Sequence, residues 1–392
     1  MKIVIDATAA ISGGRLYLEK LLPEFAEIES RHEFIVLHTG DLDRLAEAFG
    51  NQRFSQRFRF LRANIPFLKD GQWAGASILR MLWRKFVLPI HLRRLQPDLL
   101  FSNSGTVPKW KPAKTRTVIA LHNCMPLDAE LIEEETSPVR RWRLRMLRRQ
   151  MRTALESSDG SIAFSEDTRQ RIRENFGELG HTPAVVHHAI DWGEAERKAE
   201  VNFDELHRLG VAQPYLLCVS QFHRYKNVLR LLEAFARVAA NHAQLQLVLV
   251  GAAADGDYWN EVIETIERLD LTERVVDLPA VPREQLVKLY RNALGFVQPS
   301  LAETCSFPLL EALALGVPAA VAGTTAMPEM AGEAAVYFNP RNVGEMAEAL
   351  ERLIWDENLR CELSRKAVEQ AAKFTWSETA RQTLRVFEQV NS

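Results

Sequence analysis

The segment Ser300–Pro318 constrains the fold more than any other part of the sequence. An apolar run, Leu294–Gln298, precedes the segment, and a second run, Ala319–Ala322, follows its Gly-Val-Pro ending. Ser306 is a favoured N-cap residue, and Pro308 is tolerated in a first helical turn because its missing N–H would have had no helical partner. The sequence therefore predicts a strand, a loop, a short helix and a second strand.

The start of the predicted helix is a candidate site for an anion, with a carboxylate on either side of it. The first backbone N–H groups of a helix have no helical partner and can bind a negatively charged ligand. Glu303 lies in the loop before the helix, and Glu311 lies within its early turns. A diphosphate fits the N–H groups, and the hydroxyls of a ribose and a sugar fit the carboxylate acceptors, which indicates a nucleotide-sugar pocket. The expected diphosphate contacts are Ser306, Phe307, Pro308, Leu309 and Leu310.

The length and composition fit two soluble domains of ordinary size. The chain has 392 residues. A single hydrophobic core usually supports fewer residues than this, so two domains are expected. Its formal net charge of -2 provides no general attraction to nucleic acid or to an acidic membrane. No apolar run approaches the length that spans a bilayer, and Met1–Asp6 is typical of a strand and not of a signal peptide, so we expect a cytoplasmic protein. The cysteines lack the spacing of a zinc site or a disulfide framework: Cys124, Cys218, Cys305 and Cys361.

Strand-like and helix-like runs alternate through both halves of the chain, which indicates parallel βαβ units. A polar, weakly periodic stretch, Trp192–His207, is the predicted linker between the halves. The predicted strands of the first half are Lys2–Ala7, Glu33–His38, Asp98–Ser102, Thr117–Leu121 and Ser161–Phe164, and those that begin the second half are Tyr215–Val219 and Gln246–Val250.

Several chemically active residues follow predicted strands directly, where parallel sheets bind their ligands. Gly13 and Gly14 lie in the predicted turn after the first strand, where glycine lets a ligand approach the backbone. His122 follows a strand of the first half, and Arg224 and Lys226 follow the first strand of the second half, where cations can neutralise a diphosphate. The alternatives are a tight turn, a structural histidine and two solvated cations.

The sequence resembles the retaining glycosyltransferases of the GT-B fold, family 4 (glycosyl transferases group 1). Glu303 and Glu311 have the E-x7-E spacing of the donor site of that family, within the matching strand, helix and Gly-Val-Pro exit. The resemblance covers nearly the whole chain and is strongest over Tyr215–Pro340. It implies an α/β fold with two Rossmann-like domains whose parallel sheets face one another across a cleft. The implied acceptor domain is 1–195 plus a returning C-terminal helix, 376–392, and the implied donor domain is 208–375.

The resemblance also implies roles for these residues. Glu303 would hold the donor sugar and Glu311 the ribose, while Arg224 and Lys226 would stabilise the leaving diphosphate. His122 would lie beside the donor sugar. In such enzymes a glycine-rich loop, here Gly13–Gly14, faces the diphosphate, and backbone groups near Val281 read the base. The resemblance also implies a strand within Ala184–Asp191 that closes the first domain and a base-contacting strand at Arg274–Leu278. Cations take the place of a divalent metal, so no metal and no cofactor are expected. Two positions depart from the family: Asn123 replaces the usual Asp, and Gln221 stands where many members have Arg.

Two basic segments indicate how the protein meets its surroundings. Ile78–Arg94 and Val139–Arg152 combine arginines with apolar side chains, a pattern that fits an anionic membrane surface or, alternatively, a solvated helix face. No nucleic-acid-binding motif accompanies the charge. The resemblance therefore predicts a GDP- or UDP-linked sugar as donor and a glycan or lipid-linked oligosaccharide of cell-surface polysaccharide synthesis as acceptor. The expected location is the cytoplasm, with peripheral contact to the inner face of the cytoplasmic membrane.

Other functions and other readings of single motifs stay open at this point. A nucleotide-sugar epimerase or a phosphorylase would share the fold, and a non-catalytic partner subunit could use the basic helices as an interaction surface. Glu303 and Glu311 could be two solvated glutamates on an ordinary connection. The Asp255-Gly256-Asp257 motif could bind a metal-nucleotide, but its context favours a turn.

Overall fold

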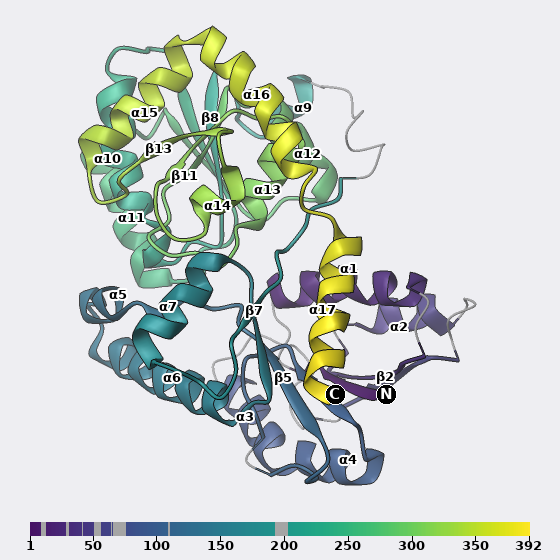
Figure 1. The fold of residues 1–392 in the computed structure, drawn as a ribbon. Coiled ribbons are helices and arrows are strands. Elements are labelled where there is room, and N and C mark those ends of the chain that lie inside the picture. The colour runs from purple at the N-terminus through teal and green to yellow at the C-terminus, as the bar shows by residue number, and fades with distance from the viewer. Residues whose placement is uncertain are drawn as a thin grey trace. The chain divides into compact units, whose positions relative to one another are not determined.

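The structure, a computed structural model, describes residues 1–8, 13–28, 31–40, 42–50, 56–63, 65, 76–108, 110–192 and 203–392 (Figure 1). The chain forms two compact units. Unit 1 contains Met1–His188 and Trp376–Ser392, and unit 2 contains Ala189–Thr375. Each unit is a parallel β-sheet with helices packed on it, so the predicted Rossmann-like architecture is confirmed.

Unit 1 is built on a seven-stranded sheet in the order β3-β2-β1-β4-β5-β6-β7, in which every neighbouring pair is parallel. The strands are β1 (Lys2–Asp6), β2 (Glu33–His38), β3 (Phe58–Arg62), β4 (Leu99–Ser102), β5 (Arg116–Ala120), β6 (Gly160–Ala163) and β7 (Ala184–Val185). The helices are α1 (Gly13–Glu27), α2 (Asp43–Gly50), α3 (Ala76–Phe86), α4 (Leu88–Leu95), η1 (Met125–Leu127), α5 (Ala129–Glu134), α6 (Pro138–Ser157), α7 (Glu166–Phe176) and α17 (Trp376–Asn391).

Alternating side chains of the unit 1 strands bury two opposite faces of the sheet. Val4 and Leu100 pack with Trp83 and Leu92 of the α3–α4 region. On β4, the next residue, Phe101, contacts Phe387 of α17 at a ring distance of 5.0 Å. The C-terminal helix α17 also packs on α1, which confirms the prediction that it returns to the first domain.

Unit 2 is built on a six-stranded parallel sheet in the order β10-β9-β8-β11-β12-β13. The strands are β8 (Tyr215–Val219), β9 (Gln246–Val250), β10 (Val275–Leu278), β11 (Gly295–Gln298), β12 (Ala319–Ala322) and β13 (Ala335–Phe338). The helices are α9 (Phe203–Arg208), η2 (Arg224–Lys226), α10 (Val228–Ala239), α11 (Gly256–Arg268), α12 (Arg283–Asn292), α13 (Phe307–Ala314), α14 (Met327–Ala331), α15 (Val343–Trp355), α16 (Glu357–Ala371).

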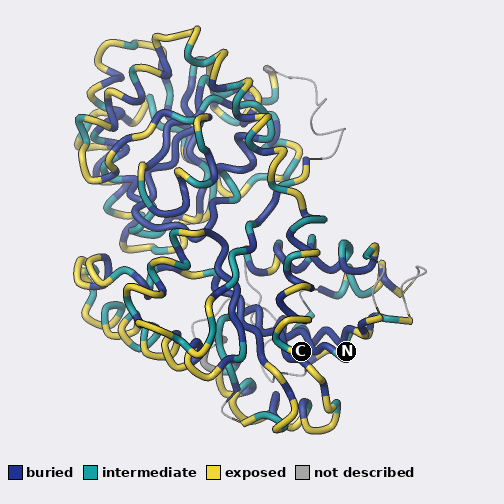
Figure 2. Tube along the Cα trace, viewed as in Figure 1, coloured by how far each residue is buried: buried dark blue, intermediate teal, exposed yellow. Residues whose placement is uncertain are grey.

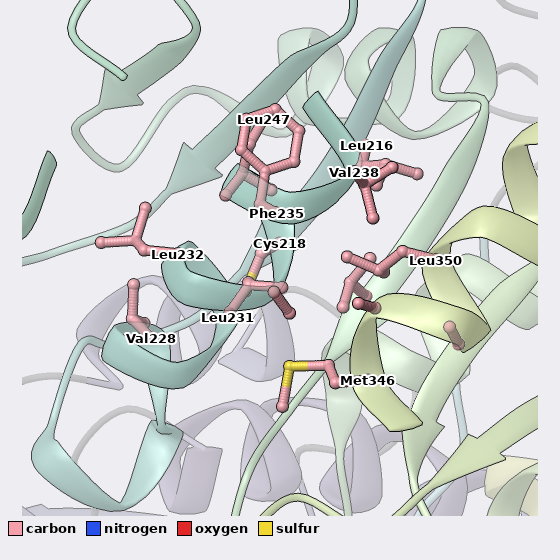
Figure 3. Packing of buried hydrophobic residues seen from close by; sticks show 14 of the residues in the cluster. Leu216, Cys218, Val228, Leu231, Leu232, Phe235, Val238, Leu247, Met346 and Leu350 are labelled. Atoms are coloured by element: carbon pink, nitrogen blue, oxygen red, sulfur yellow. The ribbon is translucent and has the colours of Figure 1, made fainter. Parts of the chain in front are cut away.

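The core of unit 2 forms around α10, whose apolar residues recur every three or four positions and so lie on one face. Leu231 and Phe235 are completely buried and belong to one cluster with Leu216 of β8 and with Met346 and Leu350 of α15 (Figure 3). The strands of both sheets are buried along most of their length, whereas the outer faces of the helices are exposed (Figure 2). Truncating one such core leucine to alanine typically costs about 2–5 kcal/mol of stability.

Both sheets share one topological feature that positions the candidate sites. In unit 1 the chain runs from β1 outward through β2 and β3, then returns to β4 on the other side of β1. In unit 2 it runs from β8 through β9 and β10, then returns to β11 on the other side of β8. At such a switch point the loops diverge beyond the carboxyl ends of the two strands and leave room for a ligand.

The structure departs from the sequence-based elements in four places. Gly13 and Gly14 lie in the first turn of α1 and not in a turn before it. The basic segment Ile78–Arg94 forms two helices that meet at Val87. The strands β3 and β13 were not predicted. The last part of the predicted linker forms helix α9. Residues 193–202 of the predicted linker lie outside the described part of the chain.

Candidate active site

The switch point of unit 2 brings together a lysine and a glutamate. Lys226 ends η2 in the loop after β8, and Glu303 lies in the loop after β11. The Lys226 Nζ donates to Glu303 Oε1 at 2.5 Å, and the two side chains are only 12% and 10% exposed. The structure thus places two predicted site residues, 77 positions apart in the chain, in direct contact at the place where this fold binds ligands.

A short hydrogen-bond chain holds Glu303 to the start of α13. Gln298, the last residue of β11, donates from Nε2 to Glu303 Oε1 at 3.1 Å and accepts from Ser306 Oγ at 3.1 Å. Ser306 is the predicted N-cap and accepts from the Leu309 N–H at 3.2 Å. Gln298 was not among the predicted site residues, although a polar residue at the end of a buried strand is a usable signal.

The N-terminus of α13 uses part of its own hydrogen-bonding capacity. The Leu309 N–H is bonded to the Ser306 side chain, the Leu310 N–H is bonded to the Ser306 carbonyl, and Pro308 has no N–H to offer. The N–H groups of Leu309 and Leu310 are therefore engaged within the helix start, while the positive dipole field of the helix is directed at its N-terminus. In the same site, Lys226 carries a full positive charge.

Glu311 lies on α13 in a buried setting that changes its acidity. Its Oε2 accepts a hydrogen bond from the Tyr290 hydroxyl of α12 at 3.0 Å, and its backbone carbonyl accepts from Trp192 Nε1 at 3.1 Å. Burial raises the pKa of Glu311 to about 7, against the opposing effects of the Tyr290 hydrogen bond and the positive charge of Arg283. Glu311 therefore exchanges a proton near neutral pH.

An arginine and a tryptophan stand beside Glu311. The Arg283 guanidinium lies 4.1 Å from the centre of the Trp192 ring and donates to the Asp191 carbonyl at 3.0 Å. Arg283 is the first residue of α12 and follows the predicted base-contacting position Val281 by two residues. Neither Trp192 nor Arg283 was a predicted site residue, because both are joined to Glu311 through space and not by sequence spacing.

Arg224 has a different environment from Lys226, although the two are neighbours in η2. The guanidinium donates to both carboxylate oxygens of Glu261 on α11, with Nη1 at 2.8 Å from Oε2, and it lies over the Tyr258 ring at 5.0 Å. Arg224 was predicted to act on the same anion as Lys226. The structure pairs it with Glu261, and its contact with an anion stays a prediction.

The switch point of unit 1 brings together His122, Asn103 and Gly14. His122 follows β5, Asn103 follows β4, and Gly14 lies in the first turn of the helix after β1. The Asn103 amide donates from Nδ2 to the Gly14 carbonyl at 2.9 Å, and Asn103 Oδ1 is 2.8 Å from His122 Nε2. Since the amide oxygen faces the histidine, Nε2 carries the proton. Asn103 was missed in the sequence, where only its position after a strand could have indicated it.

His122 is neutral in this setting. Burial lowers its pKa to about 3, and its ring packs 4.5 Å from Phe164 and 5.2 Å from Tyr17. Asn123, which replaces the usual Asp of the family, accepts a hydrogen bond from the Met125 N–H at 3.0 Å at the start of η1. His122 can therefore act through hydrogen bonds at physiological pH, but not through a positive charge.

The described part of the chain contains neither a cluster of metal ligands nor a helix that could span a membrane. Within it, no three His, Cys, Asp or Glu side chains are grouped in a way that could hold a metal ion. Asp255 of the Asp255-Gly256-Asp257 motif is the N-cap of α11 and accepts from the Tyr258 N–H at 3.2 Å. Gly256 and Asp257 lie in the first helical turn, so the motif starts a helix and does not form the predicted turn. None of the described helices is both long and apolar enough to cross a bilayer.

The fold and the two switch-point sites define a protein of the GT-B class, and comparison with known proteins identifies the family. Residues 11–194 match the family model "Glycosyltransferase Family 4", and residues 203–373 match "Glycosyl transferases group 1". The chain belongs to the group 1 glycosyltransferases.

Individual relatives are distant in sequence. The O-antigen chain mannosyltransferase B of Escherichia coli is 24% identical over 62% of this chain, and the match spans 64% of that protein's length. Sucrose-phosphate synthase from Thermosynechococcus elongatus has the same fold, with a TM-score of 0.75 and 17% identity over 100% of this chain and 99% of its own. The Anabaena Alr3699/HepE protein, in a crystal structure with UDP-glucose, has a TM-score of 0.71 and 18% identity over 99% and 100% of the two chains.

Proposed function

We propose that this protein is a retaining glycosyltransferase that moves a sugar from a nucleotide diphosphate to a hydroxyl of a glycan or lipid-linked oligosaccharide. The observation that carries the proposal is the nearly buried Lys226–Glu303 pair at the switch point of unit 2. A buried ion pair is seldom a gain in stability over apolar residues of the same size, because both charges lose their water. Its presence at a ligand-binding position favours a role in binding and chemistry.

The roles follow from the chemistry of each group. The C1–O bond to the diphosphate breaks while the bond from C1 to the acceptor oxygen forms on the same face. An oxygen of the departing diphosphate takes the acceptor proton. Lys226 stabilises the negative charge that develops on the diphosphate, the α13 dipole contributes in the same direction, and Glu303 accepts hydrogen bonds from the sugar. Glu311 accepts hydrogen bonds from the ribose hydroxyls.

His122 is proposed to hold the donor sugar in the reacting geometry. With its pKa lowered to about 3, the ring is a neutral hydrogen-bonding group. The Asn103 and Gly14 contacts fix the ring orientation before any substrate binds, which reduces the entropy lost on reaching the transition state. This role is consistent with the place beside the donor sugar that the resemblance implies for His122.

The donor and acceptor classes are supported by the relatives. HepE was crystallised with UDP-glucose, and the mannosyltransferase relative is named for the O-antigen chain. We propose a UDP- or GDP-linked hexose as donor and a cell-surface polysaccharide or its lipid-linked precursor as acceptor. Because Lys226 neutralises the diphosphate, we propose that turnover needs no divalent metal, so activity should persist in excess EDTA.

We also propose that the protein works at the inner face of the cytoplasmic membrane, in contact with anionic lipid. Leu82, Phe86 and Ile90 are 40%, 59% and 50% exposed, and they share one face because Val87 keeps a helical backbone between α3 and α4. Lys85 and the arginines of α4 add positive charge to this surface. On α6, by contrast, Arg145 and Arg148 are engaged by Glu133, Asn175 and the Pro126 carbonyl.

A vesicle assay tests this surface. The double variant Phe86→Ser and Ile90→Ser should sediment less with phosphatidylglycerol vesicles than the unmodified protein, while Trp142→Ser on α6 should not. Equal binding of all three proteins, or none to phosphatidylglycerol, would contradict the assignment.

A donor screen tests the catalytic proposal. Purified protein is incubated with UDP- and GDP-sugars without acceptor, and the released nucleotide is measured. Slow hydrolysis of one donor is expected, together with thermal stabilisation by the matching nucleoside diphosphate. Glu303→Gln should slow this hydrolysis, while the exposed Glu348→Gln should not. An epimerase would instead release an altered sugar, and a non-catalytic subunit would show neither hydrolysis nor stabilisation.

A further inference from the structure

The first turns of α11 hold η2, the turn that carries Lys226. Glu261 receives two guanidinium N–H donors of Arg224, and Tyr258 lies under the same guanidinium. Such a bidentate, charge-assisted pair is strong and directional. The residue two positions before Lys226 is therefore fixed to α11.

The residues just after Lys226 are fixed to the same helix. The buried Tyr258 hydroxyl accepts hydrogen bonds from the backbone N–H groups of Val228 at 2.8 Å and Leu229 at 3.3 Å, at the start of α10. Asp255 in turn caps α11 at the Tyr258 N–H. Lys226 thus lies between two attachments to one rigid helix.

The opposite side of η2 is attached to the loops that follow β11 and β13. Asn227 has a left-handed backbone, with φ 63°, and its side chain donates to the carbonyls of Pro299 at 3.0 Å and Pro340 at 2.7 Å. The Tyr225 carbonyl accepts from the Leu301 N–H at 2.8 Å, two residues before Glu303. These contacts set the distance between the loops of Lys226 and Glu303.

We propose that Glu261 is a positioning residue: acting through Arg224, it orients η2 so that the Lys226 ammonium reaches both Glu303 and the leaving diphosphate. The assignment rests on the proposed glycosyl transfer. It also changes the role of Arg224 from diphosphate ligand to support, because two N–H groups of its guanidinium are directed at the Glu261 carboxylate. A displacement of Lys226 by about 1 Å would be enough to lower the rate by about 10- to 100-fold.

Exchanging the charges at positions 224 and 261 tests whether Arg224 supports η2 or binds the diphosphate directly. The proteins are Glu261→Gln, Arg224→Glu, the double variant with Arg224→Glu and Glu261→Arg, and the control Glu264→Gln, an exposed acid on the same helix. We expect kcat for donor hydrolysis to fall about tenfold or more in both single variants and to recover within about threefold in the exchanged protein, with donor KM changing less than kcat. Glu264→Gln should match the unmodified protein. If the exchanged protein is inactive while Glu261→Gln is fully active, Arg224 binds the diphosphate itself.

Hydrogen exchange makes the test independent of turnover. The amides of Lys226 and Asn227 are bonded to the carbonyls of His223 and Arg224 within η2, so their protection reports the order of the turn. Protection should fall in Glu261→Gln and return in the exchanged protein. Unchanged protection in Glu261→Gln would overturn the positioning role even if no donor is hydrolysed. If no donor is hydrolysed but the amide protection changes as expected, the proposed glycosyl transfer would be refuted, whereas the attachment of η2 to α11 through Glu261 would be supported.

Discussion

The two switch points of this protein have the same topology but opposite electrostatic character. In unit 2, the loops after β8 and β11 hold a nearly buried pair of opposite charges, Lys226 and Glu303. In unit 1, the first turn after β1 and the loop after β4 are joined by the neutral side chain of Asn103, which also contacts a neutral His122. One sheet edge is therefore equipped with charge and the other with fixed neutral hydrogen bonds.

Under the proposed glycosyl transfer, this difference assigns the diphosphate to the charged site of unit 2 and sugar hydroxyls to the neutral site of unit 1. A charged group stabilises a diphosphate best when it is held away from water, which the burial of Lys226 provides. A neutral, oriented group suits sugar hydroxyls, which carry no net charge and need donors and acceptors in defined directions. We expect mutations in unit 2 to affect chemistry more than mutations in unit 1, and the following predictions test that order.

The largest effect is expected for Lys226→Met. Loss of the cation should lower kcat/KM for donor hydrolysis by about 100- to 1,000-fold, the range seen when one transition-state donor is removed. The variant should also be less stable, because Glu303 loses the cation that offsets its desolvation. The exposed Lys373→Met is the control for general charge loss. Adding Glu303→Gln to Lys226→Met should restore stability in thermal melts but not activity, and a recovery of activity would contradict the proposed role of the pair.

A smaller effect is expected for His122→Ala in unit 1. Removing one neutral hydrogen-bonding group should lower kcat/KM by about 10- to 100-fold, and the exposed His207→Ala should have no effect. Since the pKa of His122 is about 3, its protonation should produce no step in the pH–rate profile between pH 5 and 9. A step near pH 6.5 that disappears in His122→Ala would show that the histidine ionises during turnover.

Glu311 provides the pH dependence that His122 lacks. Its pKa is raised from 4.5 to about 7, so the carboxylate needed for the ribose is mostly protonated at pH 6, and donor affinity should be about tenfold weaker there than at pH 8. The folded state binds the extra proton between these pKa values, so the free energy of unfolding of the unliganded protein should fall as pH rises from 5 to 8, by up to about 3 kcal/mol. Glu311→Gln should remove both effects. Donor titrations and urea melts at several pH values measure them, and a pH-independent affinity would refute the ribose role.

The sequence predicted local features well and missed those that depend on distant partners. The strands at Glu33–His38 and Tyr215–Val219 were predicted at their observed ends because buried parallel strands are continuous apolar runs bounded by turns. The missed strands β3 and β13 are the outermost strands of their sheets, where one side lacks a neighbour and exposed residues interrupt the pattern.

The site residues divide in the same way. Glu303 and Glu311 were found from their spacing around one helix start, and Lys226 from its place after a strand. Asn103 and Glu261 were not found, because what defines them is a contact: Asn103 lies 89 positions from Gly14, and Glu261 lies 37 positions from Arg224. No local pattern distinguishes Glu261 from the other acids of α11.

The smallest effect, and the finest test of the unit 1 site, is expected for Gly14→Ala. A Cβ at this position would lie 3.3 Å from Asn103 Nδ2, so the amide that bridges Gly14 and His122 must move by a few tenths of an ångström. Alanine also favours the helix over glycine by up to about 1 kcal/mol, so stability should change little while kcat/KM falls about threefold to tenfold, a loss of about 1 kcal/mol in binding the transition state. Gly256→Ala is the control, because Gly256 lies in the first turn of α11 and no atom lies within 4 Å of the added Cβ. This variant shows only the stability that alanine adds to a helix, so its melting temperature should rise at constant kcat/KM. If Gly14→Ala keeps its kcat/KM as Gly256→Ala does, the Asn103 bridge does not control the orientation of His122. A small displacement of the Asn103 amide would then have no effect on the rate.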